Sequence, residues 1–285
     1  MRPRRFAAGL SAAAALAGVI AAAACEREAE SEGVRLRFEY REGDTLRYSY
    51  ESDGTVTIPD TSAASGTIER SYQRTMRIEE VAEGVTPRDR YRLAVTYHLP
   101  PDTTAEAPAA PITIHLEMTP QGRIHEVSGV ETAKPLFGDI DFQSYFEQAQ
   151  PVFPDRLLKV GDSWTQEVKV VAANWEPVVT SSTYVLKALT EENGEPVAII
   201  AFDGEIYLPI GHSASTAGPA MDPPQLAEER IRVQGTITFA HERGVVRRVE
   251  TTSRATVTKV AVEGGETIRR DLHIRERSRM ALIEE

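Results

Sequence analysis

The sequence contains a single cysteine, Cys25, among 285 residues. One thiol cannot form an internal disulfide, so the fold has no covalent cross-link of that kind. The cysteine follows a basic start and an unbroken run of apolar or small residues from Phe6 to Ala24. This order is typical of a secretory signal segment. We therefore predict a signal peptide over residues 1–24.

Recognisable catalytic and metal-binding motifs are also missing. The chain has no glycine-rich phosphate loop and no dinucleotide fingerprint, and its six histidines include no pair at metal-ligand spacing. The closest approach to a nucleophile elbow, residues 211–215 (Gly-His-Ser-Ala-Ser), lacks the second glycine. We therefore expect no enzyme activity, no catalytic residue, no metal and no cofactor. A hydrolase with an unrecognised site is an alternative.

Acidic side chains outnumber basic ones. The net charge is −11, and removal of residues 1–24, which carry three arginines and no acidic residue, makes it −14. Such a charge disfavours nucleic acid binding, because the phosphate backbone repels an acidic protein. We expect no nucleic acid partner.

The segment Ala22-Ala23-Ala24-Cys25 resembles the lipobox of bacterial lipoproteins, in which the cysteine is lipidated and becomes the mature N-terminus. That family usually has leucine where Ala22 stands. An ordinary signal-peptide cleavage site and a membrane-spanning anchor are the alternatives. The resemblance implies a lipid anchor on Cys25 that attaches the chain to a membrane. It also implies a location in the bacterial cell envelope, either periplasmic or on the outer surface. Residues 25–33 would then be the lipidated cysteine and an acidic tether.

Most of the remaining chain alternates between apolar and polar residues with a period of two, which is typical of half-buried β-strands. Turn-forming residues separate these segments. The segments are residues 34–40, 46–50, 68–78, 91–99, 112–118, 164–170, 184–189, 197–208, 231–239, 245–262 and 268–282. Gly235 lies within one of them and suggests a β-bulge. We predict a mainly β fold of long antiparallel strands that form a curved sheet or half-barrel.

The last predicted strand has basic side chains along one face. They are Arg269, His273, Arg275, Arg277 and Arg279. One interpretation is a solvated face that pairs with glutamates of the neighbouring strand. The alternative is a surface that binds an anionic partner. The acidic composition of the protein favours the first.

One stretch, residues 137–164, has a helical pattern and predicts one short central helix. Phe142, Phe146 and Ala149 have the spacing of one apolar helix face. Asp141 is placed to cap the start of this helix, and Pro151 to end it. The aromatic residues of the stretch are candidate ligand-binding residues: Phe142, Tyr145, Phe146, Phe153 and Trp164. They either line an apolar cavity or fill it as part of the core, and core packing is the simpler expectation.

The β-rich parts on either side of this stretch share short motifs in a common order. The matched pairs are residues 43–46 with 161–164, Ser71-Tyr72 with Thr183-Tyr184, Leu99-Pro100 with Leu208-Pro209, and residues 116–118 with 237–239. Each match alone fits coincidental β patterning, but their order favours a duplication. The predicted first half covers residues 34–136, the helix and connector cover 137–164, and the second half covers 165–285.

The central segment from Pro151 to Trp164, together with the signal segment, the single cysteine and the acidic tether, resembles an uncharacterised family of bacterial lipoproteins defined by a domain of unknown function. The long strands with one helix are more loosely similar to the half-barrels of periplasmic lipoprotein and lipid carriers. The second likeness concerns architecture only. The large curved sheet, the aromatic connector and the absence of a catalytic constellation favour a non-enzymatic binding or carrier module for an apolar small molecule or an envelope protein. A structural or assembly lipoprotein that binds other proteins is the alternative.

Overall fold

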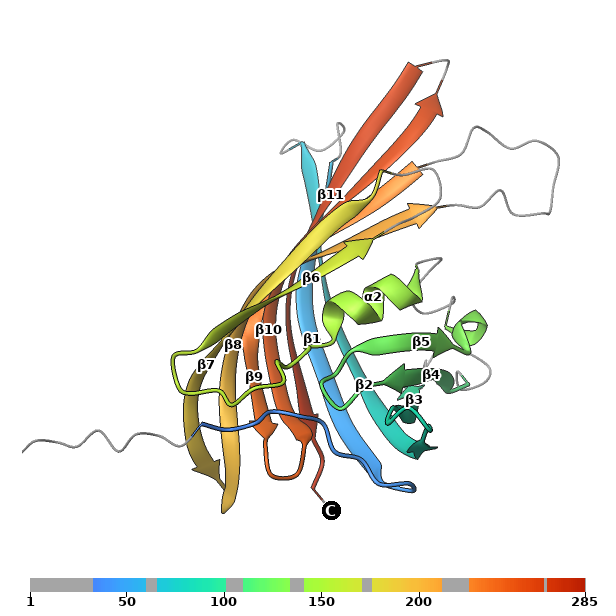
Figure 1. Cartoon of the computed structure of the whole chain (residues 1–285). Coiled ribbons are helices and arrows are strands. Elements are labelled where there is room, and N and C mark those ends of the chain that lie inside the picture. Colours follow the sequence, from blue (N-terminus) through green and yellow to red (C-terminus); the bar gives the residue numbers. More distant parts are fainter. Residues whose placement is uncertain are drawn as a thin grey trace, which may run out of the picture. The chain divides into compact units, whose positions relative to one another are not determined.

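The computed structural model describes residues 33–59, 66–100, 110–133, 141–170, 176–211, 226–263 and 266–284. This part of the chain forms one antiparallel sheet of eleven strands with a single α-helix (Figure 1). The strands are β1 (Thr45–Pro59), β2 (Thr67–Val85), β3 (Tyr91–His98), β4 (Ile112–Met118), β5 (Ile124–Ser128), β6 (Ser163–Val170), β7 (Val178–Glu192), β8 (Glu195–Gly211), β9 (Leu226–Ala240), β10 (Val245–Glu263) and β11 (Glu266–Leu282). The helix is α2 (Phe142–Ala149), and a 3₁₀ turn, η1, covers Val130–Thr132. The predicted mainly β fold with one short helix is confirmed.

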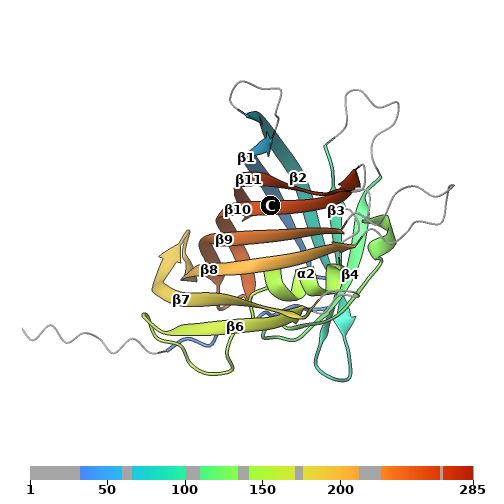
Figure 2. The same cartoon turned by 90° about the horizontal axis from the view of Figure 1, so that it is seen from above.

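The sheet consists of two meanders joined through one pair of strands. Its order is β5-β4-β3-β2-β1-β11-β10-β9-β8-β7-β6, so the first and last strands of the chain pair at the centre. Strands β5 and β6 are the two edges, and the sheet does not close between them. Figure 2 shows the strands curving around α2, which contacts β5, β6 and β8. The helix therefore lies on the concave side, near the open seam between the edges.

Alternate residues of each strand face this concave side, which we call the inner face. Tyr48, Ile200 and Phe239 are buried there in one continuous hydrophobic core. The period-two patterns in the sequence therefore predicted which side chains pack. Within the described residues, no helix has the length and hydrophobicity needed to cross a membrane.

Residues 33–41, which we call the N-terminal strap, are extended but lie outside the sheet. The prediction of a sheet strand at 34–40 is therefore wrong. The strap crosses one end of the sheet, bonding through Val34 to Leu158, through Phe38 N–H to the Pro120 carbonyl at 2.7 Å, and through Glu39 N–H to the Gly244 carbonyl at 3.0 Å. It holds the ends of both meanders together. Apolar and polar residues alternate in the strap because the side chains of Leu36 and Phe38 are buried in the core.

Two similar turns precede β1 and β6. Gly43 and Gly161 have φ angles of 88° and 94°, a region that glycine enters without strain. In each turn the following aspartate side chain accepts a hydrogen bond from the backbone N–H three residues earlier, at 2.7 and 3.1 Å. The backbone carbonyl of the aspartate then accepts from Ala82 in the first turn and from Leu186 in the second, at 2.9 Å in both. The matched Gly-Asp pairs thus make the same set of hydrogen bonds.

The pairing of the strands that follow these turns disagrees with one of the motif matches, that of Ser71-Tyr72 with Thr183-Tyr184. Leu46 pairs with Glu80, and Trp164 pairs with Tyr184. By position in the sheet, Tyr184 therefore corresponds to Glu80 and not to Tyr72. Duplication of the two halves stays a prediction.

Gly235 has a different role from the predicted bulge. It pairs in regular register with Thr251 on one side and Phe202 on the other, whereas the register shift between β9 and β10 falls between Val246 and Arg248. A Cβ atom at this position would lie 3.0 Å from the Phe202 ring and 2.2 Å from the Glu250 carbonyl oxygen. Glycine is therefore present because another chain segment approaches closely.

Candidate functional site

Helix α2 begins and ends as the sequence predicted. The Asp141 side chain accepts hydrogen bonds from the Ser144 backbone N–H at 3.3 Å and from the Ser144 hydroxyl at 2.5 Å, and the helix ends at Gln150, before Pro151. Its buried face differs from the predicted one. Ala149 is exposed, whereas the polar side chains of Ser144 and Gln148 are buried with Phe142.

The buried polar residue Gln148 fixes the helix against β8. Its amide accepts a hydrogen bond from the Tyr207 N–H at 2.8 Å and donates one to the Tyr207 carbonyl at 3.0 Å. Strand β7 pairs with β8 only as far as Gly204 opposite Ser182. Beyond that point Gln148 bonds to the edge of β8 as a neighbouring strand would, which explains why a polar residue lies on the buried side.

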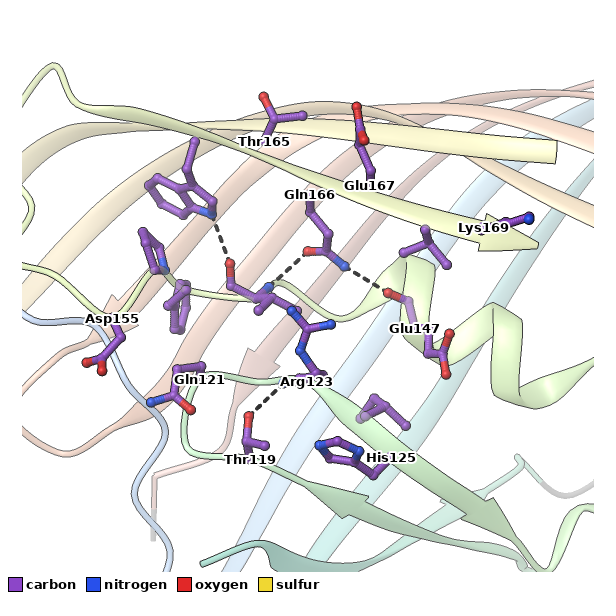
Figure 3. Close-up of a pocket in the computed structure, with 16 residues that line it drawn as sticks. Thr119, Gln121, Arg123, His125, Glu147, Asp155, Thr165, Gln166, Glu167 and Lys169 are labelled. Carbon is purple, nitrogen blue, oxygen red and sulfur yellow. Dashed lines mark hydrogen bonds between the residues drawn. The ribbon is translucent and has the colours of Figure 1, made fainter. Parts of the chain in front are cut away.

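A second glutamine, Gln166 of β6, holds the end of the helix. It donates to the carbonyls of Glu147 and Gln150 at 2.8 and 3.1 Å, and it accepts from the Val152 N–H at 2.9 Å. Figure 3 shows this side chain between the strand and the connector. The final carbonyls of a helix have no partner within the helix, and Gln166 supplies one. The helix is therefore anchored to β8 and β6 by two side-chain amides.

A cleft of about 780 Å³ lies at the open seam of the sheet. One wall contains residues 123–125 at the start of β5, and the other contains residues 164–169 of β6 (Figure 3). Thr119, Gln121, Glu147 and residues 152–155 complete it. The lining is mainly polar and carries both charge signs, so this cleft suits a polar partner better than an apolar one.

The five predicted ligand-binding aromatic residues do not share one surface. Phe142 and Phe153 are buried, and the Phe153 ring centroid lies 5.2 Å from that of Phe38 and 4.9 Å from that of Phe239. These two rings are packed as part of the core.

The other three predicted aromatic residues are half-buried. Trp164 lines the seam cleft, donates its indole N–H to the Val152 carbonyl at 3.0 Å and stacks on Tyr184. Tyr145 and Phe146 contact each other on α2, with ring centroids 5.4 Å apart. Ligand binding by the five residues stays a prediction. Tyr145 lies near charged side chains that border the surface described next.

Past the packed core, the inner face of the sheet presents a second set of apolar side chains. A row of register pairs runs from β1 to β8: Val56, Ile274, Ala255, Ile231 and Ile206. With Val233 we call this set the distal inner face. Its members are half-buried, apart from the buried Ala255, and none belongs to the packed core cluster. Five strands therefore hold apolar side chains in partial contact with solvent.

Two carboxyls flank this row on opposite sides, Glu276 level with Ser253 and Glu229 level with Val257. Glu276 accepts hydrogen bonds from the Tyr50 hydroxyl at 3.1 Å and from the Tyr72 hydroxyl at 2.5 Å. Burial, followed by the charge of Glu276, raises the pKa of Glu229. Burial raises the pKa of Tyr145 to about 12, with further contributions from Tyr50, Glu276 and Glu229. Helix α2, β9 and β11 thus place two carboxyls and a phenol beside the apolar row.

The sequence marks these two carboxyls by its alternation pattern, although they belong to no recognisable motif. Glu229 and Glu276 occupy inner-face positions of strands whose other inner positions include Ile231 and Ile274. A charged residue that breaks an apolar alternation is a candidate for a specific role, because its burial is otherwise unfavourable.

A scan of protein-family models and a search of curated proteins find no match to this chain.

The predicted signal peptide over 1–24 and most of the tether over 25–33 lie outside the described residues, and so do two candidate sites. They are lipidation at Cys25 and the serine-containing segment 212–215. In the part of the chain that the structure describes, no three His, Cys, Asp or Glu side chains gather in a group that could hold a metal ion.

Proposed function

We propose that this chain is a bacterial envelope lipoprotein that binds or carries an apolar ligand on the distal inner face of its sheet and acts without catalysis or a cofactor. The proposed anchor is a lipid on Cys25, which the signal segment and the solitary cysteine support. The acidic mature chain supports a soluble domain that does not bind nucleic acid.

The observation that carries the proposal is the apolar row from Val56 to Ile206, whose members apart from the buried Ala255 are half-buried. Apolar side chains gain free energy when they leave water, at about 25 cal/mol for each Å² buried. Here they line a concave face outside the packed core. An apolar molecule lying along them would complete their burial, and Tyr145 with the two carboxyls would meet its polar groups.

Native mass spectrometry of the gently purified full chain tests this proposal. We expect a bound apolar molecule that is lost on delipidation, and we expect Ile231→Glu to prevent its recovery. The matched control is Val179→Glu, because Val179 is 61 % exposed on β7 and the added charge there meets solvent. Recovery of the unliganded chain alone, before and after delipidation, would count against the proposal.

The seam cleft favours a second candidate function, in which the protein binds another protein. Residues 164–169 of edge strand β6 line the cleft consecutively, so the strand presents its edge there. Exposed strand edges pair with extended segments of other chains. Crosslinking in cells from a photoreactive residue at Thr165 discriminates: one specific protein adduct supports this function, and its absence supports the first.

We also propose that the two meanders arose by duplication. The shared hydrogen bonds of the turns at Gly43 and Gly161 support this, as does the order of the matched motifs. A duplication gives two meanders whose joining produces one large concave face.

A further inference from the structure

The outer face of β9, β10 and β11 carries three exposed arginines in one row. Arg232 pairs with Arg254, and Arg254 pairs with Arg275, in the register of adjacent strands. Directly opposed side chains have Cβ atoms about 5 Å apart, and like charges in that arrangement destabilise a sheet. Arg254 has a like charge on both sides. Folding stability therefore does not explain the row.

Among the side chains that the structure describes, acidic ones approach only one end of the row. Asp203 lies 3.4 Å from the Arg232 guanidinium, and Glu205 lies 3.8 Å from that of Arg230. Both acids belong to β8. They are exposed, and exposed ion pairs of this kind contribute little.

The other two arginines of the row lack such partners among the described side chains. In the described strands, neither Arg254 nor Arg275 forms an ion pair with an acidic side chain. The predicted pairing of the last strand with neighbouring glutamates holds only further along, where Arg279 lies 3.8 Å from Glu250. It is wrong for Arg275, whose neighbour on β10 is Arg254.

We propose that this arginine row docks the protein on an anionic phospholipid surface. The planar guanidinium forms paired hydrogen bonds to phosphate oxygens, and each arginine near an anionic bilayer adds to membrane attraction. The row spans three adjacent strands, or about 10 Å, which matches an array of headgroups better than a single small anion. An anionic surface also removes the repulsion that the row creates within the sheet.

The position of the row connects it to the distal inner face. Arg232, Arg254 and Arg275 directly follow or precede Ile231, Ala255 and Ile274, so the two rows lie back to back on the same part of the sheet. With the proposed lipid on Cys25, the eight residues before Gly33 reach at most about 29 Å, which keeps the sheet near the bilayer. Docking would leave the apolar face accessible on the opposite side.

Vesicle co-sedimentation tests the proposal on the mature chain, residues 25–285 with Cys25→Ser, which carries neither the lipid nor the apolar run from Phe6 to Ala24, so that binding reports the protein surface alone. We expect binding to phosphatidylcholine vesicles containing phosphatidylglycerol, no binding to phosphatidylcholine alone, and a steep decrease with added salt. Arg254→Gln and Arg275→Gln should each lower the partition coefficient about fivefold. Arg88→Gln, an exposed arginine in the β2–β3 turn, removes the same charge elsewhere and should leave it unchanged.

Thermal unfolding of the same variants adds an independent readout. Arg254→Gln should raise the Tm, because it relieves repulsion on both sides. A variant that bound vesicles weakly because its fold was damaged would instead have a lower Tm. Equal binding to both vesicle types, or unchanged partition in both arginine variants, would overturn the proposal. So would salt-dependent binding to polyglutamate without binding to vesicles, since the partner would then be an acidic protein. Lipidation and ligand binding by the wild-type chain are judged separately, by its mass and its bound molecules.

Discussion

Glu80 is a carboxyl on the inner face of β2, beside the core. Its Oε2 accepts a hydrogen bond from the Tyr40 hydroxyl of the N-terminal strap at 3.2 Å. Burial raises the pKa of Glu80 from 4.5 to about 7, and the bond from Tyr40 opposes part of that change. Its proximity also contributes to the raised pKa values of Tyr48 and Tyr97, after burial. The fold therefore favours the neutral form of this side chain.

This pKa predicts how stability depends on pH. A carboxyl whose pKa is higher in the folded state stabilises the fold fully below its unfolded pKa, and the contribution is lost as pH rises through the folded pKa. The unfolding free energy should thus fall between pH 4.5 and about 7, by up to about 1.4 kcal/mol per pH unit from this group. Urea unfolding across that range measures it.

Glu80→Gln should remove this pH dependence and make the protein more stable than wild type at pH 8, because the amide keeps an acceptor for Tyr40 without a charge. Glu79→Gln, on the outer face, is the control and should retain the wild-type slope. A Glu80→Gln variant with the same slope as wild type would show that Glu80 is ionised normally in the fold.

At the scale of elements, α2 is positioned by polar contacts more than by its apolar spacing. Gln148 bonds to the unpaired edge of β8, and Gln166 bonds to the last carbonyls of the helix. The predicted apolar position Ala149 points to solvent instead. The aromatic spacing located the helix and its cap in the sequence. The residues that orient it could not be recognised, because their partners lie in strands distant in sequence.

Gln148→Met should destabilise the protein by about 1–3 kcal/mol, since it removes the two hydrogen bonds that the Gln148 amide makes to the buried backbone of Tyr207. Urea unfolding monitored by circular dichroism measures the change. The control is Gln143→Met, at a half-buried position of the same helix whose side chain bonds only within the helix. Equal stability of the two variants would mean that the amide bonds to β8 contribute nothing.

Over the described chain as a whole, the sequence predicted strands and the faces that pack, but not their assembly. Local alternation at Tyr48 or Ile200 shows which side is buried. It does not show that β1 pairs with β11, because that pairing joins residues more than two hundred positions apart. The strap alternates like a strand because Leu36 and Phe38 are buried, yet within the described residues its backbone pairs with turns and with a single bridge partner rather than with a strand.

At this scale we propose a separate role for each of the two faces of the sheet. Near the strap, the inner face is filled by Phe38, Phe153 and Phe239. Past this packed core, the same face holds half-buried apolar side chains, while the outer face holds the arginine row. Ligand binding is therefore expected on only one part of the concave side.

Methyl NMR of the isoleucine-labelled protein tests this claim most directly. Titration with dodecyl maltoside below its micelle concentration should shift the methyl signals of Ile206, Ile231 and Ile274 in a saturable way. The signals of Ile114 and Ile200, which are fully buried in the core, serve as internal controls and should stay in place. Unchanged signals from the first three residues, or shifts confined to Ile124 at the seam cleft, would contradict the proposed apolar site.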